Sequence, residues 1–260
     1  GGIARQFVGD LLTDPSTRDV HNAAHHVVAV GSSSSVVKAQ NFIHDVIGAL
    51  QQDSTNVKAC GSYEELMEVP EVDIVYVAPP ASHHYPNVLM CFKAGKHVLC
   101  EKPFTINAQQ TEHLIRVAQQ KNLFLMEAVW TRFFPSIAPL SKIIHSSSSP
   151  EAIIGKPVKL FADFSLQIHP PSSPTSSRRW DDRLYDPSLG GGALLDLGIY
   201  CVTWACMVLM DDPRNRGEMP KISTSMVKTV REGDGAHDED DGWKGEVDES
   251  TTIVLTFDRT

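Results

Sequence analysis

The sequence predicts an α/β domain with a parallel sheet, followed by an α+β domain with an open, mostly antiparallel sheet. In the first half, short β-branched runs alternate with segments of helical spacing, which is typical of parallel strands covered by helices on both faces. After Trp130 this rhythm ends and longer segments of period-2 character begin. A chain of 260 residues is long enough for two domains, and we place them at 1–130 and 131–260.

The first domain opens on a glycine turn that enters an amphipathic helix with Ile3, Phe7 and Leu11 on one stripe. Strands are expected at 26–30, 57–60, 72–77, 97–100 and 123–127. Helices are expected at about 36–46, 63–67, 85–94 and 108–120. The helices between the strands supply the right-handed crossovers that parallel strands need.

The second domain begins with a helix around 137–144 and a period-2 strand at 158–168. Residues 170–189 are rich in Pro and Ser, and we expect a lid or a loop that orders on binding. Three glycines then open an apolar helix at about 193–210. Two further strands are expected at 222–230 and 251–257. The sheet is expected to be unfinished at Thr260.

Charge is concentrated in one segment of the chain. The formal net charge is −9, and residues 232–249 hold nine acids against Lys244 alone, which accounts for −8. We interpret this run as a solvated loop. An acidic chain without clustered Lys and Arg excludes a nucleic-acid footprint.

The five cysteines form no Cys-x-x-Cys pair and lie in apolar surroundings. This pattern indicates reduced thiols in a reducing compartment, so we expect a cytoplasmic protein with no metal site. We find neither an apolar run close to 18 residues nor a basic-plus-apolar leader, and we therefore expect no membrane partner.

Ligands of an open parallel sheet bind beyond the carboxyl ends of its strands. The strand 26–30 ends in Gly31 and four serines, where a carboxylate would hold the ribose 2′-hydroxyl of NAD. Hydroxyls of Ser32 and Ser33 with nearby Lys38 can accept a 2′-phosphate instead, which favours NADP. The alternative is an ordinary serine helix cap. At the chain start, the helix amides after Gly1-Gly2 could hold a pyrophosphate, or the glycines form a simple turn.

Two later strands are also followed by residues that could bind a ligand or take part in catalysis. Pro79 and Pro80 stiffen the turn after 72–77, and His84 follows, either as a site residue or as a satisfied turn residue. Glu101 and Lys102 follow a buried run and place an ammonium at the mouth of the sheet, or form a salt bridge there.

The apolar helix 193–210 carries two polar side chains at i and i+4, Asp196 and Tyr200. Buried polar groups on such a surface need partners. They are either site residues or, in the alternative, a cap and a hydrogen-bonded core tyrosine.

Taken together, four motifs resemble the glucose–fructose oxidoreductase / inositol dehydrogenase family. They are the Gly-Gly-Ile-Ala start, Pro80 with His84, Glu-Lys-Pro at 101–103, and Gly-Gly-Gly-x-x-x-Asp-x-Gly at 190–198. Within that family, the serine run, the segment 126–135 and Tyr200 resemble the dimeric dihydrodiol dehydrogenases and, more closely, the fungal NADP-dependent D-xylose 1-dehydrogenases.

The resemblance implies a Rossmann domain that binds NADP and an α+β domain that binds the substrate and pairs subunits into a homodimer. It also implies that both ends are truncated, with the first strand before Gly1 and the last strands after Thr260. By this resemblance, the catalytic residues of the chain would be Lys102, Tyr200 and Asp196. The substrate would be bound by Trp130, Arg132 and Asp196. The cofactor-binding residues would be Gly1, Gly2, Ile3, Ser32, Ser33, Lys38, Pro79, Pro80, His84, Glu101 and Lys102.

The implied reaction oxidises an aldose C1 hydroxyl, such as D-xylose to xylonolactone, or a trans-dihydrodiol, by hydride transfer to nicotinamide. A free tyrosine, with a pKa near ~10, is a poor base at neutral pH, and an adjacent ammonium favours its phenolate. The alternatives are a nicotinamide-binding regulator without turnover and an inactive fragment of the same family.

Overall fold

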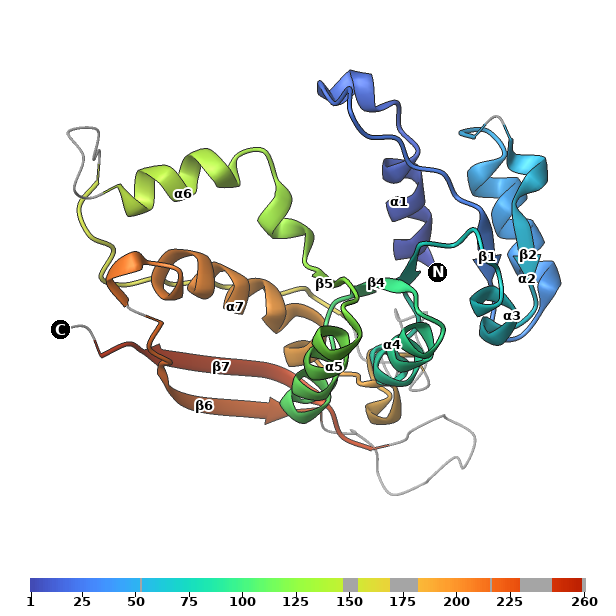
Figure 1. Cartoon of the computed structure of the whole chain (residues 1–260). Helices are drawn as coiled ribbons and strands as arrows, with labels where there is room; N and C mark the ends of the chain where they lie inside the picture. The colour runs from blue at the N-terminus through green and yellow to red at the C-terminus, as the bar shows by residue number, and fades with distance from the viewer. Residues whose placement is uncertain (52, 147–153, 169–181, 216, 230–244, 259–260) are drawn as a thin grey trace. The chain divides into compact units, whose positions relative to one another are not determined.

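The computed structural model describes residues 1–51, 53–146, 154–168, 182–215, 217–229 and 245–258. The chain divides into two compact units (Figure 1). The first contains Gly1–Pro79 and His83–Glu127, and the second contains Pro80–Ser82 and Ala128–Thr260.

The first unit is built from parallel strands and covering helices, as the sequence predicts. Its helices are α1 (Gly2–Leu11), α2 (Val36–Phe42), α3 (Tyr63–Met67), α4 (His84–Lys93) and α5 (Ala108–Lys121). Its strands are β1 (Ala29–Gly31), β2 (Lys58–Cys60), β3 (Ile74–Val77), β4 (His97–Glu101) and β5 (Leu125–Ala128). The parallel pair β1–β2 forms one ladder, and β3-β4-β5 forms a second, with β3 and β4 parallel. The predicted sheet is therefore present as two ladders.

Side-chain caps fix where these helices begin and end. Ser35 Oγ accepts from the second residue of α2, and Asn107 Oδ1 accepts from the third residue of α5. Ser62 and Glu65 form a capping box on α3, in which the Glu65 carboxylate reaches back to the amide that precedes Ser62. Asn122 ends α5 in the left-handed conformation at φ 52°.

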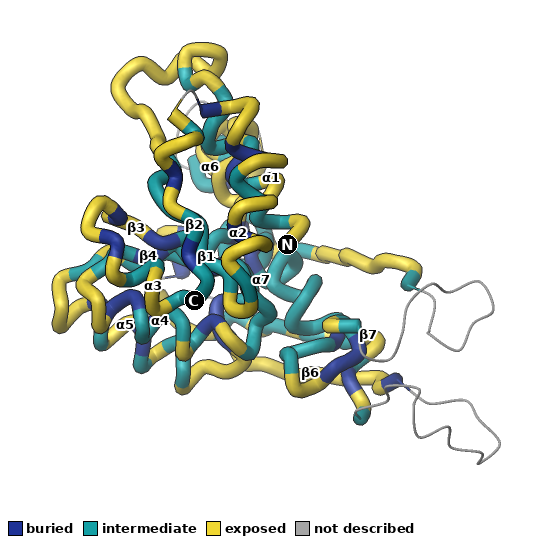
Figure 2. The backbone as a smooth tube through the Cα atoms, turned by 90° about the vertical axis from the view of Figure 1, so that its right-hand side faces the viewer, coloured by how far each residue is buried: buried dark blue, intermediate teal, exposed yellow. Residues whose placement is uncertain are grey.

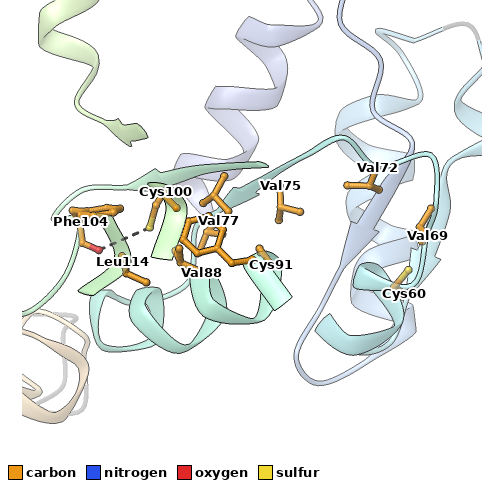
Figure 3. Packing of buried hydrophobic residues seen from close by; sticks show 13 residues of the cluster. Cys60, Val69, Val72, Val75, Val77, Val88, Cys91, Cys100, Phe104 and Leu114 are labelled. Atoms are coloured by element: carbon orange, nitrogen blue, oxygen red, sulfur yellow. Dashed lines mark hydrogen bonds between the residues drawn. The ribbon is translucent and has the colours of Figure 1, made fainter. Parts of the chain in front are cut away.

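The main core of the first unit packs the second ladder against α4 and α5 and extends to Cys60 of β2 and to Val69 and Val72 (Figure 3). Along β3 and β4, buried residues alternate with more exposed ones, and β4 ends in two buried residues (Figure 2). The most completely buried members of this core are Phe92, Leu114, Val88, Val98, Cys60, Cys91 and Cys100. Burial raises the pKa of the Cys91 thiol to about 12 and raises that of Cys100 as well. These thiols therefore pack as small apolar groups.

The second unit is α+β with antiparallel strands, again as predicted. It contains α6 (Ile137–His145), α7 (Ile199–Ala205), β6 (Lys221–Lys228) and β7 (Asp248–Thr256). Helix α7 lies within a longer helical stretch that has π-type hydrogen bonds at Leu194–Gly198 and Cys206–Met210. Strands β6 and β7 pair antiparallel (Figure 1). Ile144, Val208 and Leu209 form a small core between α6 and the end of this stretch.

One strand prediction was wrong, and another was wrong at its start. Residues 158–168 form no strand, and Val158 and Phe161 are 82% and 84% exposed. Alternation of apolar and polar residues predicts only which face a side chain takes, whereas a strand also needs a neighbour to pair with, and none is present among the described residues. The first predicted strand begins at Ala29 instead of His26, because the Gln51 side-chain amide makes both hydrogen bonds to the Val27 main chain.

Two other predictions fall mainly outside the described residues. They are the loop or lid at 170–189, described only from residue 182, and the acidic run at 232–249, described only from residue 245.

One helical stretch bears on the expectation that nothing spans a membrane. Pro187–Met210 is long and apolar enough to cross a bilayer, with a mean hydropathy of 1.9, by length and composition alone. Core helices of soluble proteins meet the same criterion. The carboxylate of Asp196, at mid-helix, forms an ion pair with Arg183.

Candidate active site

The carboxyl end of β1 carries hydroxyls and one ammonium. Lys38 Nζ donates to Ser34 Oγ at 3.1 Å, and the Ser34 amide lies 3.4 Å from Ser32 Oγ. Ser33 and Lys38 are exposed. Ser35 provides the helix cap, so the cap and the hydroxyl cluster use different serines. With no acid among residues 31–38, this end of the ladder suits an added phosphate better than a ribose diol.

The start of α1 also faces solvent. Gly1 and Gly2 are exposed, and a Cβ added to either would meet no atom within 4 Å. Gly1 offers no side-chain cap, and so the first-turn amides can bind an anion. Half-buried Ile3 is on the first turn, and Phe7 stacks on Tyr76 of β3 with ring centroids 3.9 Å apart. That stack ties α1 to β3, the strand that precedes Pro79 and Pro80.

Lys102 directly follows β4, on a loop that hydrogen bonds to neighbouring side chains hold in place. The buried carboxylate of Glu101 accepts a short hydrogen bond from the Tyr76 hydroxyl and a 3.2 Å bond from the Lys102 amide. Burial, together with this carboxylate, raises the pKa of Tyr76. Lys102 is half-buried, and its peptide bond to Pro103 is cis. The prediction that an ammonium follows β4 at the sheet end agrees with this placement.

His84 lies beneath the same loop and is 1% exposed. Its Nδ1 is 2.8 Å from the Pro103 carbonyl oxygen, and its Nε2 is 3.0 Å from that of Pro79. Burial lowers the pKa of His84, and the two carbonyl acceptors oppose this shift. The imidazole thus links the turn after β3 to the loop after β4.

Glu127 completes the anchoring of this loop, although it is not among the site residues predicted from the sequence. Its Oε1 accepts from the Phe104 amide at 2.8 Å. Glu127 is the third residue of β5, so the ends of β4 and β5 both hold the segment 101–104 through a carboxylate. A signal was available, because an acid at the end of an apolar strand repeats the placement of Glu101.

In the second unit, Tyr200 is the second residue of α7, and its phenol oxygen accepts a hydrogen bond from Trp130 Nε1 at 3.1 Å. Phe164 stands nearly perpendicular to the tyrosine ring, with centroids 5.3 Å apart. The structure therefore brings together two predicted site residues, Trp130 and Tyr200, that are 70 positions apart in sequence. Phe164 belongs to the segment that was expected to be a strand.

Asp196 and Arg132 each form an ion pair. Asp196 Oδ1 lies 3.2 Å from Arg183 Nη1, and Arg132 Nη1 lies 3.2 Å from Asp211 Oδ2. The second pair lines a shallow pocket of about 120 Å³ together with apolar side chains of α6 and of the stretch around Val208. Within the second unit, neither ion pair includes Tyr200 or Trp130.

The helix that carries Asp196 and Tyr200 is capped from a distant strand. Asp248, the first residue of β7, accepts from the Leu194 amide at 2.7 Å and from Thr251 Oγ1 at 2.9 Å through one carboxylate oxygen. A negative charge at a helix N-terminus is stabilising. Gly192 makes room for it, because a Cβ there would stand 2.1 Å from the other oxygen of Asp248. No sequence signal links residues 54 positions apart.

Among the described residues, no group of three or more His, Cys, Asp or Glu side chains could hold a metal ion. The polar groups at the ends of β1, β3 and β4 instead suit an anionic dinucleotide: hydroxyls and Lys38 for a phosphate, uncapped amides at α1, and Lys102 at the sheet mouth. The residues present therefore fit NADP.

Comparison with known proteins covers both units. A family model described as an oxidoreductase family with an NAD-binding Rossmann fold matches residues 1–129. A second, described as the GFO/IDH/MocA C-terminal domain, matches residues 151–260.

Among curated relatives, a D-xylose 1-dehydrogenase (NADP(+)) from Hypocrea jecorina is 39% identical over 260 residues, covering 100% of this chain and 60% of that protein. A trans-1,2-dihydrobenzene-1,2-diol dehydrogenase from Xenopus tropicalis is 36% identical over 257 residues, covering 99% of this chain and 63% of that protein. The chain thus spans about three fifths of the length of these relatives.

Among solved structures, an NAD-binding oxidoreductase from Klebsiella pneumoniae has a TM-score of 0.64 at 23% identity, covering 98% of this chain and 60% of that one. An aldose-aldose oxidoreductase from Caulobacter crescentus has a TM-score of 0.60 at 24% identity, covering 91% of this chain and 61% of that one. At these identities the two structures confirm the fold alone.

Proposed function

The chain belongs to the GFO/IDH/MocA oxidoreductase family, and from this premise we propose that the whole protein is an NADP-dependent dehydrogenase acting on an aldose or a trans-dihydrodiol. The observation that carries the proposal is the hydrogen-bonded phenol of Tyr200, on a helix that also bears a carboxylate. The names of the relatives, a D-xylose dehydrogenase and a dihydrodiol dehydrogenase, support this choice of substrates.

The ends of β1, β3 and β4 and the start of α1 are proposed to hold the cofactor. Ser32, Ser33 and Lys38 would bind the 2′-phosphate of NADP, and the start of α1 at Gly1, Gly2 and Ile3 would bind the pyrophosphate. A second group of cofactor-binding residues follows β3 and β4. It comprises Pro79, Pro80, His84, Glu101 and Lys102. His84 would act there through the two main-chain carbonyls that it contacts.

Lys102, Tyr200 and Asp196 are proposed as the catalytic residues. When bound, NADP supplies the nicotinamide that accepts the hydride. Tyr200 takes the hydroxyl proton during oxidation and returns it during reduction, which contributes about 10²–10⁴-fold. In this proposal the ammonium of Lys102 would stabilise the phenolate during the reaction by its charge.

Three residues are proposed to bind the substrate. Asp196 and Arg132 would hold its hydroxyls, each at the cost of its present ion pair. Trp130, 52% exposed, would present an aromatic face to a sugar or diol ring.

Assembly and location extend the same proposal. A homodimer formed through the second unit's sheet is supported by the exposed apolar side chains of β6 and β7, including Ile222, Val227 and Val254. A cytoplasmic location is supported by the five free cysteines, of which three are buried.

The proposal is tested by incubating the full-length protein with NADP and D-xylose, D-glucose or a trans-dihydrodiol, and following the absorbance of the reduced nicotinamide. Turnover with at least one substrate is expected. Tyr200→Phe should lower that turnover by at least about 10²-fold and leave NADPH binding nearly intact. NADPH binding without turnover on any substrate would favour a nicotinamide-binding regulator, and turnover unchanged in Tyr200→Phe would remove Tyr200 from its role.

A further inference from the structure

We infer that Trp130 is a positioning residue for Tyr200, and that its indole N–H fixes the phenol oxygen that receives the substrate proton. This inference rests on the proposed function. It gives Trp130 a task separate from contact with the substrate ring.

The direction of the hydrogen bond follows from the chemistry of the two groups. An indole Nε1–H is a donor only, and so in the 3.1 Å contact the phenol oxygen of Tyr200 must accept. A bond from a neutral N–H becomes charge-assisted, and about twice as strong, when its acceptor is a phenolate. The contact therefore directs a donor at the oxygen on which the proton is exchanged.

Both rings in this contact are held by other aromatic side chains. Phe134 packs against Trp130 at a centroid distance of 6.1 Å, and Phe164 packs against Tyr200 at 5.3 Å. Aromatic side chains also have only two χ angles to fix. The packing therefore fixes where the indole N–H meets the phenol oxygen of Tyr200. This position matters because displacing a reacting atom by about 1 Å can lower the rate about 10²-fold.

A donor role and a stacking role predict different kinetics for Trp130→Phe. A phenyl ring keeps an aromatic face for the substrate but has no N–H. Loss of a hydrogen bond to a charged group should lower kcat about 10- to 100-fold and leave KM within about twofold. If Trp130 only stacked on the substrate, KM would change and kcat would not.

The test combines this variant with Tyr200→Phe in the full-length protein. Because the two side chains act as one unit, Trp130→Phe should have no further effect on kcat in the Tyr200→Phe background. Phe133→Leu is the matched control: Phe133 is 63% exposed and lies three residues after Trp130 in the same short helix, and its replacement should leave kcat within about twofold.

An NMR readout tests the contact without turnover. In a ¹H–¹⁵N spectrum, the indole resonance of Trp130 is the one lost in Trp130→Phe. Tyr200→Phe should shift this resonance and speed its hydrogen exchange, because the acceptor oxygen is gone.

The outcomes separate the inference from the function on which it rests. A parent protein without turnover on any substrate overturns both. An active parent whose kcat is unchanged by Trp130→Phe overturns the inference alone, as does an indole resonance that does not respond to Tyr200→Phe.

Discussion

Gly192→Ala should destabilise the second unit, because an alanine there is strained and displaces a carboxylate that caps a helix. Gly192 has φ +106°, where an L side chain is strained, and the new methyl would stand 2.1 Å from Asp248 Oδ1. The carboxylate would have to move, and the Leu194 amide at the start of the Tyr200 helix would lose its 2.7 Å bond.

The magnitude follows from the two causes. Backbone strain at such a φ costs about 1–3 kcal/mol, and loss of a helix N-cap costs about 0.5–2 kcal/mol. Together they lower the free energy of unfolding by roughly 1.5–5 kcal/mol, a large share of the ~5–15 kcal/mol typical of a domain. With a urea dependence of about 2 kcal/mol per molar, the unfolding midpoint should fall by about 0.8–2.5 M.

Tryptophan fluorescence during urea unfolding is a suitable assay, because all four tryptophans of the chain lie after residue 127 and so report on the second unit. Gly217→Ala is the matched control: Gly217 also has a positive φ, +75°, but a Cβ there meets no atom within 4 Å. Its midpoint should fall by only about 0.5–1 M. Equal midpoints for the two variants would refute the role given to Asp248.

Two further predictions concern the first unit. In a fluorescence titration, the unmodified chain should bind NADPH more tightly than NADH. Lys38→Ala should weaken NADPH binding about fivefold or more without changing NADH binding. An equal loss of affinity for both nucleotides would contradict the phosphate site. Burial lowers the pKa of His84 in the folded state. The imidazole therefore binds a proton near pH 6.5 in the unfolded state, at a pH where it is still neutral in the folded state. Stability should therefore fall as the pH drops below about 6.5, by at most ~1.4 kcal/mol per pH unit. Thermal unfolding followed by circular dichroism should show a shallower fall in His84→Gln, and an unchanged slope would contradict this assignment.

Much of the first unit could be predicted because its signals are local. Strands β3 and β4 read as short apolar runs, and α5 is bounded by Asn107 and Asn122, both residues that cap helices. The position of Lys102 directly after a buried strand is visible in the sequence for the same reason. Glu127 was missed although its position is equivalent to that of Glu101.

The second unit was harder to predict because its key contacts are distant in sequence. Trp130 and Tyr200 were each singled out, but nothing in the sequence indicated that one donates to the other. Residues 158–168 have the alternation of a strand, yet Phe164 serves as an aromatic neighbour of Tyr200 instead. Periodicity reports which side chains share a face and carries no information about whether another strand pairs with them.

The cap supplied by Asp248 also bears on the order of synthesis. A ribosome completes residues 193–210 well before it adds residue 248, so the Leu194 amide lacks the Asp248 carboxylate until the start of β7 has been made. A nascent chain halted before that point would carry Tyr200 on a helix with a frayed beginning. The helix that carries Tyr200 therefore lacks its cap until an aspartate 48 residues later has been translated.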